Sequence, residues 1–413
     1  MQILARRLVR AALPAFLSLP LSLSLVACGD STPANGDGTI NLVDGRTGGG
    51  DGGVGGDSTQ PPQPDSGPSG LPLLGNGTHS AGSVTITVVA QGKDGLMGPR
   101  DLAFHPDSRG QLWIVNQGDE SVVILGDATG ANDSAQNLKR RTLTGAHFLA
   151  QPSGIAFGED FSGWNGKRNF ATIHETDKKT QGPNGTPADF MGPTLYTSDL
   201  NVFDGGHGGH LDMMHNSPNG MGIAWEKANV YWVFDGYHNS IARYDFGKDH
   251  GPGGTYHGDG SVRHYAMGNV KREPQVPSHM AFGPQKKMLY VADTGNARVA
   301  VIDTSLGNVA TPVMPNYDGG EQVVMSGVSI RTFAEGSANQ LSKPSGIAIN
   351  DGVVFVSDWK TSRITAFDMQ GKRLDWLDTG RAAGSLMGLA VGPDGNLYVV
   401  DFKANEVLRI EPK

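Results

Sequence analysis

One short phrase recurs six times along this chain, and it constrains the fold more than any other feature. The phrase consists of a proline, one further residue, a small or polar residue and then alternating apolar residues. Its copies begin at Pro99, Pro152, Pro218, Pro277 and Pro344, and Leu386 replaces the proline in the sixth copy. Each copy precedes a segment such as "LYVADTGNARVAVID", in which two apolar runs flank a polar turn. Alternation with period two predicts strands, so each unit is a strand–turn–strand element of a sheet.

The repeated units resemble the NHL repeat, a family of β-propeller blades, over residues from about 95 to 411. The resemblance implies an all-β fold: a six-bladed β-propeller with four antiparallel strands per blade around a central channel. Residues 81–92, "AGSVTITVVAQG", alternate in the same way but lack the phrase. We expect them to supply the outer strand of the last blade, which closes the ring and removes an exposed sheet edge.

The N-terminal residues have the features of a secretory signal. Arg6, Arg7 and Arg10 give a positive start, and a largely apolar run follows over residues 11–27. The sequence "LVAC", which ends at Cys28, resembles the lipobox of bacterial lipoproteins, in which the cysteine is lipidated and becomes the mature N-terminus. Cys28 is the only cysteine, so it has no disulfide partner within the chain. We therefore predict a signal peptide over residues 1–27 and a lipid-anchored, extracytoplasmic protein of the bacterial cell envelope.

The composition then separates a linker from a globular part. Residues 28–80 are rich in glycine, aspartate and proline and contain little apolar material, which predicts a flexible linker. The propeller is expected over residues 81–413. The chain has 33 Lys+Arg against 41 Asp+Glu, a net charge of −8, and no long basic run. Nucleic acid is therefore not an expected partner. We expect a monomer that contacts the membrane only through its lipid anchor.

Histidines gather around the third copy of the repeat. His207, His210 and His215 lie in "HGGHLDMMH", in the connection that enters the third blade. His238 lies in the turn between the second and third strands of that blade, and His279 opens the inner strand of the fourth. The NHL resemblance puts such loops on one face, at the mouth of the channel. Imidazole binds zinc and copper, and methionine sulfur adds a preference for copper(I). These five histidines are the predicted zinc or copper ligands.

Two alternatives to this metal site stay open. A loop with so much glycine is costly to order around an ion, so "HGGHLDMMH" is equally interpreted as a polar connection. A second candidate metal set is His250, His257 and Asp259. These residues lie between the third and fourth strands of the third blade, which the NHL architecture puts on the opposite face.

Two stretches also resemble one enzyme family of NHL propellers, the peptidylglycine amidating lyases. They are "VFDGYHNSIARYDF" and "LYVADTGNARVAVID". The resemblance implies a zinc ion held by three channel histidines, Tyr237 as the base and Arg298 as a second catalytic residue. The zinc histidines of that family directly follow the proline that opens a blade. This chain has Arg100, Ser153, Asn219, Ser278 and Ser345 there. A lyase activity therefore requires a metal site rebuilt from other histidines.

One polar residue recurs at the end of the second strand of each unit. It is Asn116, His174, Asp235, Asp293, Asp358 and Asp401 in the six copies. A short acid at such a position typically caps its own turn through backbone N–H groups. Tyr237, Trp359 and Phe402 lie beside it in three copies. With Arg100, these aromatic residues are candidate ligand-binding residues at the channel mouth, unless they pack against neighbouring blades.

Two functions from different classes follow from these observations. The first is a binding module that holds a protein, peptide or glycan at its channel face. The alternative is a metal-dependent lyase or hydrolase that uses the histidine-rich face.

Overall fold

The structure is a computed structural model of the chain. It describes residues 70–132, 136–140, 147–162, 167–177, 190–203 and 209–413. The expected signal peptide, Cys28, most of the expected linker and His207 lie outside the described residues. None of the helices in the described part of the chain is long and apolar enough to cross a membrane.

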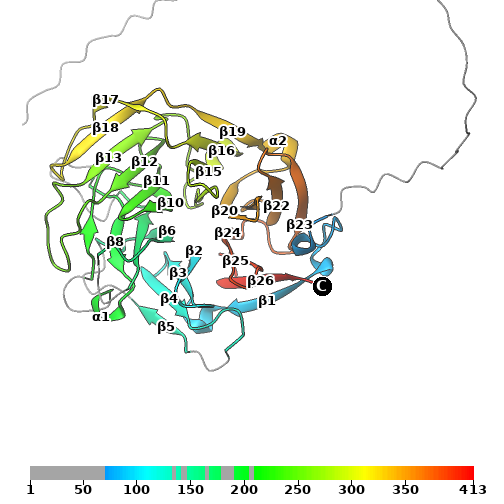
Figure 1. Cartoon of the computed structure of the whole chain (residues 1–413). Coiled ribbons are helices and arrows are strands. Elements are labelled where there is room, and N and C mark those ends of the chain that lie inside the picture. Colours follow the sequence, from blue (N-terminus) through cyan, green and yellow to red (C-terminus); the bar gives the residue numbers. More distant parts are fainter. Residues whose placement is uncertain (1–69, 133–135, 141–146, 163–166, 178–189, 204–208) are drawn as a thin grey trace, which may run out of the picture. The chain divides into compact units, whose positions relative to one another are not determined.

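The described residues form six sheets arranged around a central axis (Figure 1). Blade one contains β2 (Pro99–Phe104), β3 (Leu112–Asn116), β4 (Ser121–Leu125) and β5 (Leu138–Arg140). Blade two contains β6 (Pro152–Phe157), β7 (Asn169–His174), β8 (Thr194–Thr197) and β9 (Asp212–Met213). Blade three contains β10 (Gly220–Lys227), β11 (Val230–Asp235), β12 (Ser240–Asp245) and β13 (Ser261–Tyr265).

The remaining blades follow the same order from the axis outward. Blade four contains β14 (Met280–Phe282), β15 (Met288–Asp293), β16 (Arg298–Asp303) and β19 (Ile330–Glu335). Blade five contains β20 (Pro344–Asn350), β21 (Val353–Asp358), β22 (Arg363–Asp368) and β23 (Arg373–Asp378). Blade six contains β24 (Leu386–Val391), β25 (Leu397–Asp401), β26 (Glu406–Pro412) and β1 (Val84–Ala90). The short helices are η1 (Pro72–Leu74), η2 (Ala81–Ser83), η3 (Gly92–Asp94), α1 (Leu200–Phe203), η4 (Thr294–Asn296) and α2 (Gly336–Asn339).

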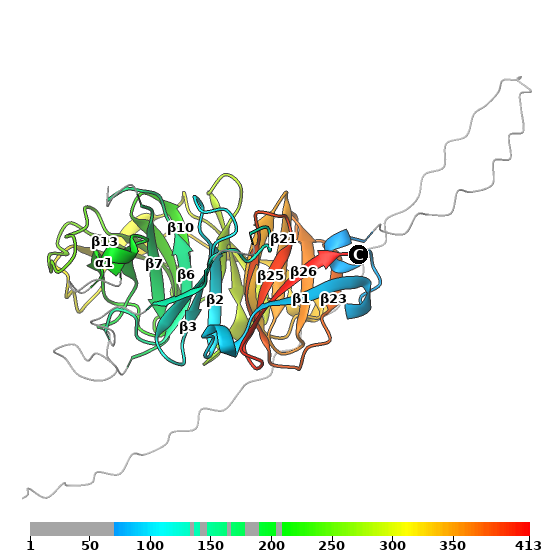
Figure 2. The ribbon, with the colours of Figure 1, turned by 90° about the horizontal axis from the view of Figure 1, so that it is seen from below.

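The first strand closes the ring, as the sequence predicts. β1 pairs antiparallel with β26, with Val84 opposite Pro412 and Ile86 opposite Ile410. Figure 2 shows β1 beside β26 at the side of the ring where the chain ends. The outer strand of blade six therefore comes from the beginning of the propeller and its other three strands from the end.

The core is divided among the six junctions between neighbouring blades, and each junction contains one apolar cluster. Both faces of a blade are thus covered, which is why β3 and β7 are buried along their whole length. The glycine in the repeated phrase allows the inner strands to approach closely. A Cβ at Gly346 would lie 2.3 Å from the carbonyl oxygen of Met387 in the next blade.

Two features depart from a regular propeller. A hairpin of β17 (Asn308–Pro312) and β18 (Glu321–Ser326) is inserted between β16 and β19 of blade four. β18 pairs parallel with β13, so the sheet of blade three has six strands.

The second departure corrects the expected linker boundary, because residues 70–80 pack against blade five. The carboxylate of Asp375 accepts hydrogen bonds from the backbone N–H groups of Leu71, at 2.8 Å, and Gly77, at 3.1 Å. Leu74 is fully buried in the cluster between blades five and six. The propeller unit therefore includes residues from position 70, rather than beginning at position 81.

Candidate functional site

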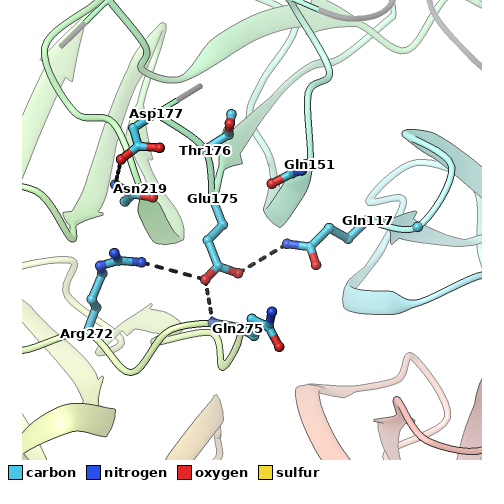
Figure 3. Close-up of a pocket in the computed structure, with 9 residues that line it drawn as sticks. Gln117, Gln151, Glu175, Thr176, Asp177, Asn219, Arg272 and Gln275 are labelled. Carbon is cyan, nitrogen blue, oxygen red and sulfur yellow. Dashed lines mark hydrogen bonds and ion pairs between the residues drawn. The ribbon is translucent and has the colours of Figure 1, made fainter. Parts of the chain in front are cut away.

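A polar pocket of about 770 Å³ opens where loops of blades one to four meet, and Figure 3 shows it. The turns after β3 and β7 and the connections into β6, β10 and β14 supply its walls. Its lining residues are Gln117, Gly118, Gln151, Glu175, Thr176, Asp177, Asn219, Arg272 and Gln275. These are the two kinds of loop that the NHL resemblance implies on the channel face.

Glu175 lies at the centre of this pocket and is only 8% exposed. Gln117 Nε2 donates to its Oε2 at 3.1 Å, and the backbone N–H of Gln275 donates to its Oε1 at 2.5 Å (Figure 3). Arg272 Nη1 lies 3.8 Å from the same Oε1. Polar groups from blade one and from the connection into blade four therefore point toward one carboxylate of blade two, which fixes its position before any ligand arrives.

Arg100 contacts two residues of the pocket wall and is 3% exposed. Its Nε donates to Gln117 Oε1 at 2.9 Å, and its Nη1 donates to the carbonyl oxygen of Gln275. Its guanidinium also lies 4.6 Å from the ring centroid of Phe402 in blade six. Burial lowers the pKa of Arg100 to about 10, and the negative charge of Glu175 opposes this shift. Arg100 thus remains a cation at neutral pH, and its charge interacts with the carboxylate of Glu175.

The rim of the pocket is fixed by contacts between the loops after β7 and before β10. Asn219 Nδ2 donates to Asp177 Oδ2 at 3.2 Å, and the backbone N–H of Asn219 donates to the carbonyl of Thr176 at 3.1 Å. Asn219 has a φ of 55°, in the left-handed region that asparagine tolerates better than most residues. Asn219, in "SPNG", therefore allows the backbone to turn and also lines the pocket with its side chain.

The recurring acids at the ends of the second strands cap turns, as the sequence predicts. Asp235 Oδ1 accepts hydrogen bonds from the backbone N–H groups of Tyr237, at 2.9 Å, and His238, at 3.0 Å. Asp358 Oδ1 accepts from the N–H of Thr361 at 2.8 Å. Asp358 Oδ2 also accepts from the N–H of Lys343, at 2.7 Å, in the connection that enters its own blade. The carboxylate of Asp358 therefore fixes both the turn after β21 and the loop that enters blade five.

The predicted aromatic residues contribute less to the pocket than expected. Trp359 and Phe402 are half-buried and pack against the apolar cluster between blades six and one. Tyr237 is 38% exposed and contacts the ring of His238. Sequence reasoning missed Glu175, Gln117 and Arg272. The only available signal was the position of "HETD" directly after the second strand of blade two.

Four of the five predicted metal-ligating histidines lie in the described residues, and these four do not form one site. His279 Nε2 lies 2.9 Å from the carbonyl oxygen of Ser153, and its Nδ1 lies 3.4 Å from Asp101 Oδ1. His279 thus faces a small cavity between the inner strands. His238 Nδ1 lies 2.6 Å from Asp235 Oδ2, with His264 beside it.

His210 and His215 lie elsewhere, on either side of β9, the outer strand of blade two. A strand of two residues is too short for an alternating pattern, so the sequence predicts a single loop that enters blade three. The prediction that both histidines lie in such a loop at the channel mouth is therefore wrong.

The second predicted metal set is also corrected. Asp259 Oδ2 accepts a hydrogen bond from the backbone N–H of Lys248 at 3.0 Å, within its own loop. His257 instead lies beside Asp212, with 2.7 Å between Nδ1 and Oδ1. His250 and His257 therefore lie near His210 and His215, rather than on an opposite face.

The residues transferred from the lyase resemblance have structural partners. Arg298 Nε donates to Asp293 Oδ2 at 2.8 Å, and its Nη2 donates to the carbonyl of Asn269 at 2.8 Å. At two of the positions that follow a blade-opening proline, serine hydroxyls bind the next blade. Ser153 Oγ donates to the carbonyl of Gly220 at 2.6 Å, and Ser345 Oγ to that of Leu386 at 2.9 Å.

No protein-family model matches the chain, and no curated protein matches it in sequence. Solved structures share its architecture. A protein of unknown function from Bacteroides thetaiotaomicron VPI-5482 is 9% identical, with a TM-score of 0.50 over 80% of this chain and 76% of that chain. An auxiliary nutrient binding protein from Bacteroides ovatus ATCC 8483 is 13% identical, with a TM-score of 0.48 over 80% and 77%. Virginiamycin B lyase from Staphylococcus aureus is 11% identical, with a TM-score of 0.44 over 80% and 100%. Such identities concern the fold alone, and by its own sheet order the chain is a six-bladed β-propeller.

Proposed function

We propose that the protein is a lipid-anchored, extracytoplasmic propeller that binds a glycan in the pocket around Glu175. The observation that carries this proposal is the lining of one 770 Å³ pocket by four carboxamide side chains. They belong to Gln117, Gln151, Asn219 and Gln275. A carboxamide offers both donors and an acceptor, and a sugar hydroxyl does the same. Several such groups around one space match a ligand with many hydroxyls.

The rest of the lining favours a glycan over an apolar or strongly charged ligand. The described lining residues are polar or charged apart from Gly118, so the lining is mainly polar and suits neither a fatty chain nor a hydrophobic peptide side chain. The carboxylates of Glu175 and Asp177 are balanced by Arg272 and by the buried Arg100. A pocket with balanced charges fits a neutral polyol better than a polyanion or a polycation.

The fixed position of Glu175 supports binding as well. A group that is already held in place loses little conformational freedom when a ligand arrives, so more of the contact energy appears as affinity. Lipidation of Cys28 would hold this pocket at a membrane surface, where glycans of the cell envelope or its surroundings are accessible.

The test is a binding screen of the purified protein against a panel of neutral, amino and acidic oligosaccharides, followed by calorimetry on those retained. We expect one glycan per chain. Glu175→Ala should weaken binding by about 10- to 100-fold, because it removes an acceptor and frees Gln117 and Arg272. The matched control is Glu321→Ala, an exposed glutamate on β18, which should bind like wild type. Retention of peptides instead of oligosaccharides, or binding unaffected by Glu175→Ala, would refute the proposal.

A further inference from the structure

A second group of polar side chains lies outside the pocket, where β9 of blade two meets the connection between β12 and β13 of blade three. Asp212 opens β9, while His250 and His257 belong to the connection. Asp212 Oδ1 lies 2.7 Å from His257 Nδ1 and 4.0 Å from His250 Nε2. One ligand atom from each of the three residues lies within 4.8 Å of the others. The side chains of Asp212 and His250 are 0% and 3% exposed.

Two atoms of this group are buried and have no hydrogen-bond partner: Asp212 Oδ2 and His250 Nε2. The other nitrogen of His250, Nδ1, lies 2.6 Å from the carbonyl oxygen of Gly251. A carbonyl only accepts hydrogen bonds, so in the neutral ring Nδ1 carries the proton and Nε2 has the lone pair. A histidine held in this way by a backbone carbonyl is in the tautomer that binds a metal through its other nitrogen.

An ion pair between Asp212 and His257 accounts for the contact between Asp212 Oδ1 and His257 Nδ1. It leaves Asp212 Oδ2 and His250 Nε2 without a partner. Burying such atoms without partners costs stability, so they call for a partner such as a bound ion or water. Asp212 Oδ2 and His250 Nε2 are typical metal-ligand atoms, and their residues belong to two segments that are far apart in the sequence. Because the fold brings these residues together, we infer that they share a ligand.

The surrounding imidazoles have spacings that suit one metal ion. The ring centroids of His250 and His257 are 5.2 Å apart, and those of His257 and His215 are 6.0 Å apart. Rings that share one zinc ion through bonds of 2.0–2.1 Å have centroids about 5–6 Å apart. The Nδ1 of His215 likewise contacts the carboxylate of Asp318, and its buried Nε2 has no hydrogen-bond partner. His215 and His257 line a cavity of about 410 Å³ beside the group.

We propose that Asp212, His250 and His257 bind one divalent transition-metal ion, with the cavity of His215 on its open side. Two imidazoles and one carboxylate form a ligand set that zinc and non-haem iron(II) both use, with remaining positions left for an exogenous ligand. Magnesium and calcium prefer oxygen ligands, so this set selects against them. The ion would also fix the loop of blade three to the outer strand of blade two.

The experiment uses the full chain, stripped with a chelator and then titrated with Zn²⁺, Co²⁺, Fe²⁺ under anaerobic conditions, and Mg²⁺. We expect one Zn²⁺ per chain by elemental analysis, a higher melting temperature with Zn²⁺, and visible absorption bands with Co²⁺ that report nitrogen ligation. Mg²⁺ should change none of these. His250→Gln and Asp212→Asn should each weaken Zn²⁺ binding by about 100-fold or more, since loss of even an outer partner of a ligand costs 10- to 100-fold.

The matched control is His238→Gln. His238 belongs to the other described group of metal-ligand atoms, with Asp235 and His264. The His238→Gln variant should bind Zn²⁺ like wild type. The melting temperatures of the metal-free variants show whether each one folds, and Asp212→Asn keeps the shape of the side chain that contacts His257. The proposal is overturned if wild type binds none of the transition metals, or if His238→Gln abolishes binding while His250→Gln does not.

Discussion

The imidazole of His215 is held by Asp318, which lies 103 residues later in the chain. His215 Nδ1 lies 2.6 Å from Asp318 Oδ1, and the backbone N–H of His215 donates to Asp318 Oδ2 at 2.9 Å. Asp318 lies in the loop between β17 and β18, so the hairpin inserted in blade four reaches across blade three. It fixes the connection that follows β9, next to the group of Asp212, His250 and His257.

Replacing Asp318 by alanine should therefore destabilise the fold. The change leaves the backbone N–H of His215, its Nδ1 and the amide of Gln322 without their shared acceptor. We expect the free energy of unfolding to fall by about 2–4 kcal/mol, as for other buried polar groups that lose a charged partner. Urea denaturation followed by tryptophan fluorescence measures this change. Glu321→Ala is the control, because its exposed ion pair with Arg263 should contribute less than about 1 kcal/mol.

A deletion series should show that residues 70–80 belong to the propeller. Removal of residues 1–69 should leave the melting temperature unchanged. Removal of residues 1–81 takes away the buried Leu74 and the backbone donors to Asp375, and should cost about 2–4 kcal/mol. Removal of residues 1–91 also deletes β1, exposes the edge of β26 and should cause aggregation, which size-exclusion chromatography detects. Equal melting temperatures for the first two deletions would contradict this assignment.

The buried His174 should make the fold sensitive to acid. Burial lowers the pKa of His174 to about 4, although the carbonyl of Gly192 accepts a hydrogen bond from Nδ1 and opposes the shift. An unfolded histidine titrates near pH 6.5, so between pH 6.5 and 4 the unfolded chain binds a proton that the folded chain does not. The stability is complete above pH 6.5 and should fall by up to roughly 3 kcal/mol as the pH approaches 4.

The measurement is the free energy of unfolding in urea from pH 4.5 to 7.5 for wild type and His174→Asn. The variant should be less stable at neutral pH but should lose less stability on acidification. Burial also lowers the pKa of His147 to about 4, so some slope should remain in the variant. An identical slope in both proteins would exclude His174 as a cause.

Lipidation of Cys28 is tested independently of the fold. Expression of the full chain with a clickable fatty-acid probe should label wild type and leave Cys28→Ser unlabelled, because serine provides no thiol for the lipid. A labelled Cys28→Ser protein would show that the anchor is elsewhere or absent.

The sequence predicted the fold well because each blade repeats the same local pattern. Alternating apolar residues and a capping acid are short-range features, and they identify the inner three strands of five blades, the inner two strands of blade two and the closing role of β1. The outer strands are harder, because β9 has two residues and β5 has three, which is too short for any periodicity. The insertion of β17 and β18 likewise depends on pairing with β13, which no local pattern encodes.

For the pocket around Glu175, the sequence predicts only the face of the propeller on which it lies. The NHL resemblance implies which loops lie on the channel face, but it does not identify Glu175, whose position depends on Gln117 and Gln275 from two other blades. Residues 70–80 contain the apolar residues of "LPLLGNG", but they follow a segment whose composition predicts a linker, so the boundary is predicted too late. The places of His210 and His215 differ from the prediction because β9 turns part of the expected loop into the outer edge of blade two.

The pairing of β1 with β26 has a consequence for the order in which the blades fold. Lys413 Nζ donates to the carbonyl of Gly82 at 2.6 Å, across 331 residues of sequence. Blades one to five can form from strands that follow one another in the chain. Blade six cannot, since its outer strand comes first in the sequence and its other three come last. β1 therefore stays unpaired until the end of the chain is in place, and contacts at such long range form slowly. We expect a chain that lacks β26 to keep β1 unpaired and to be the form that aggregates or binds chaperones.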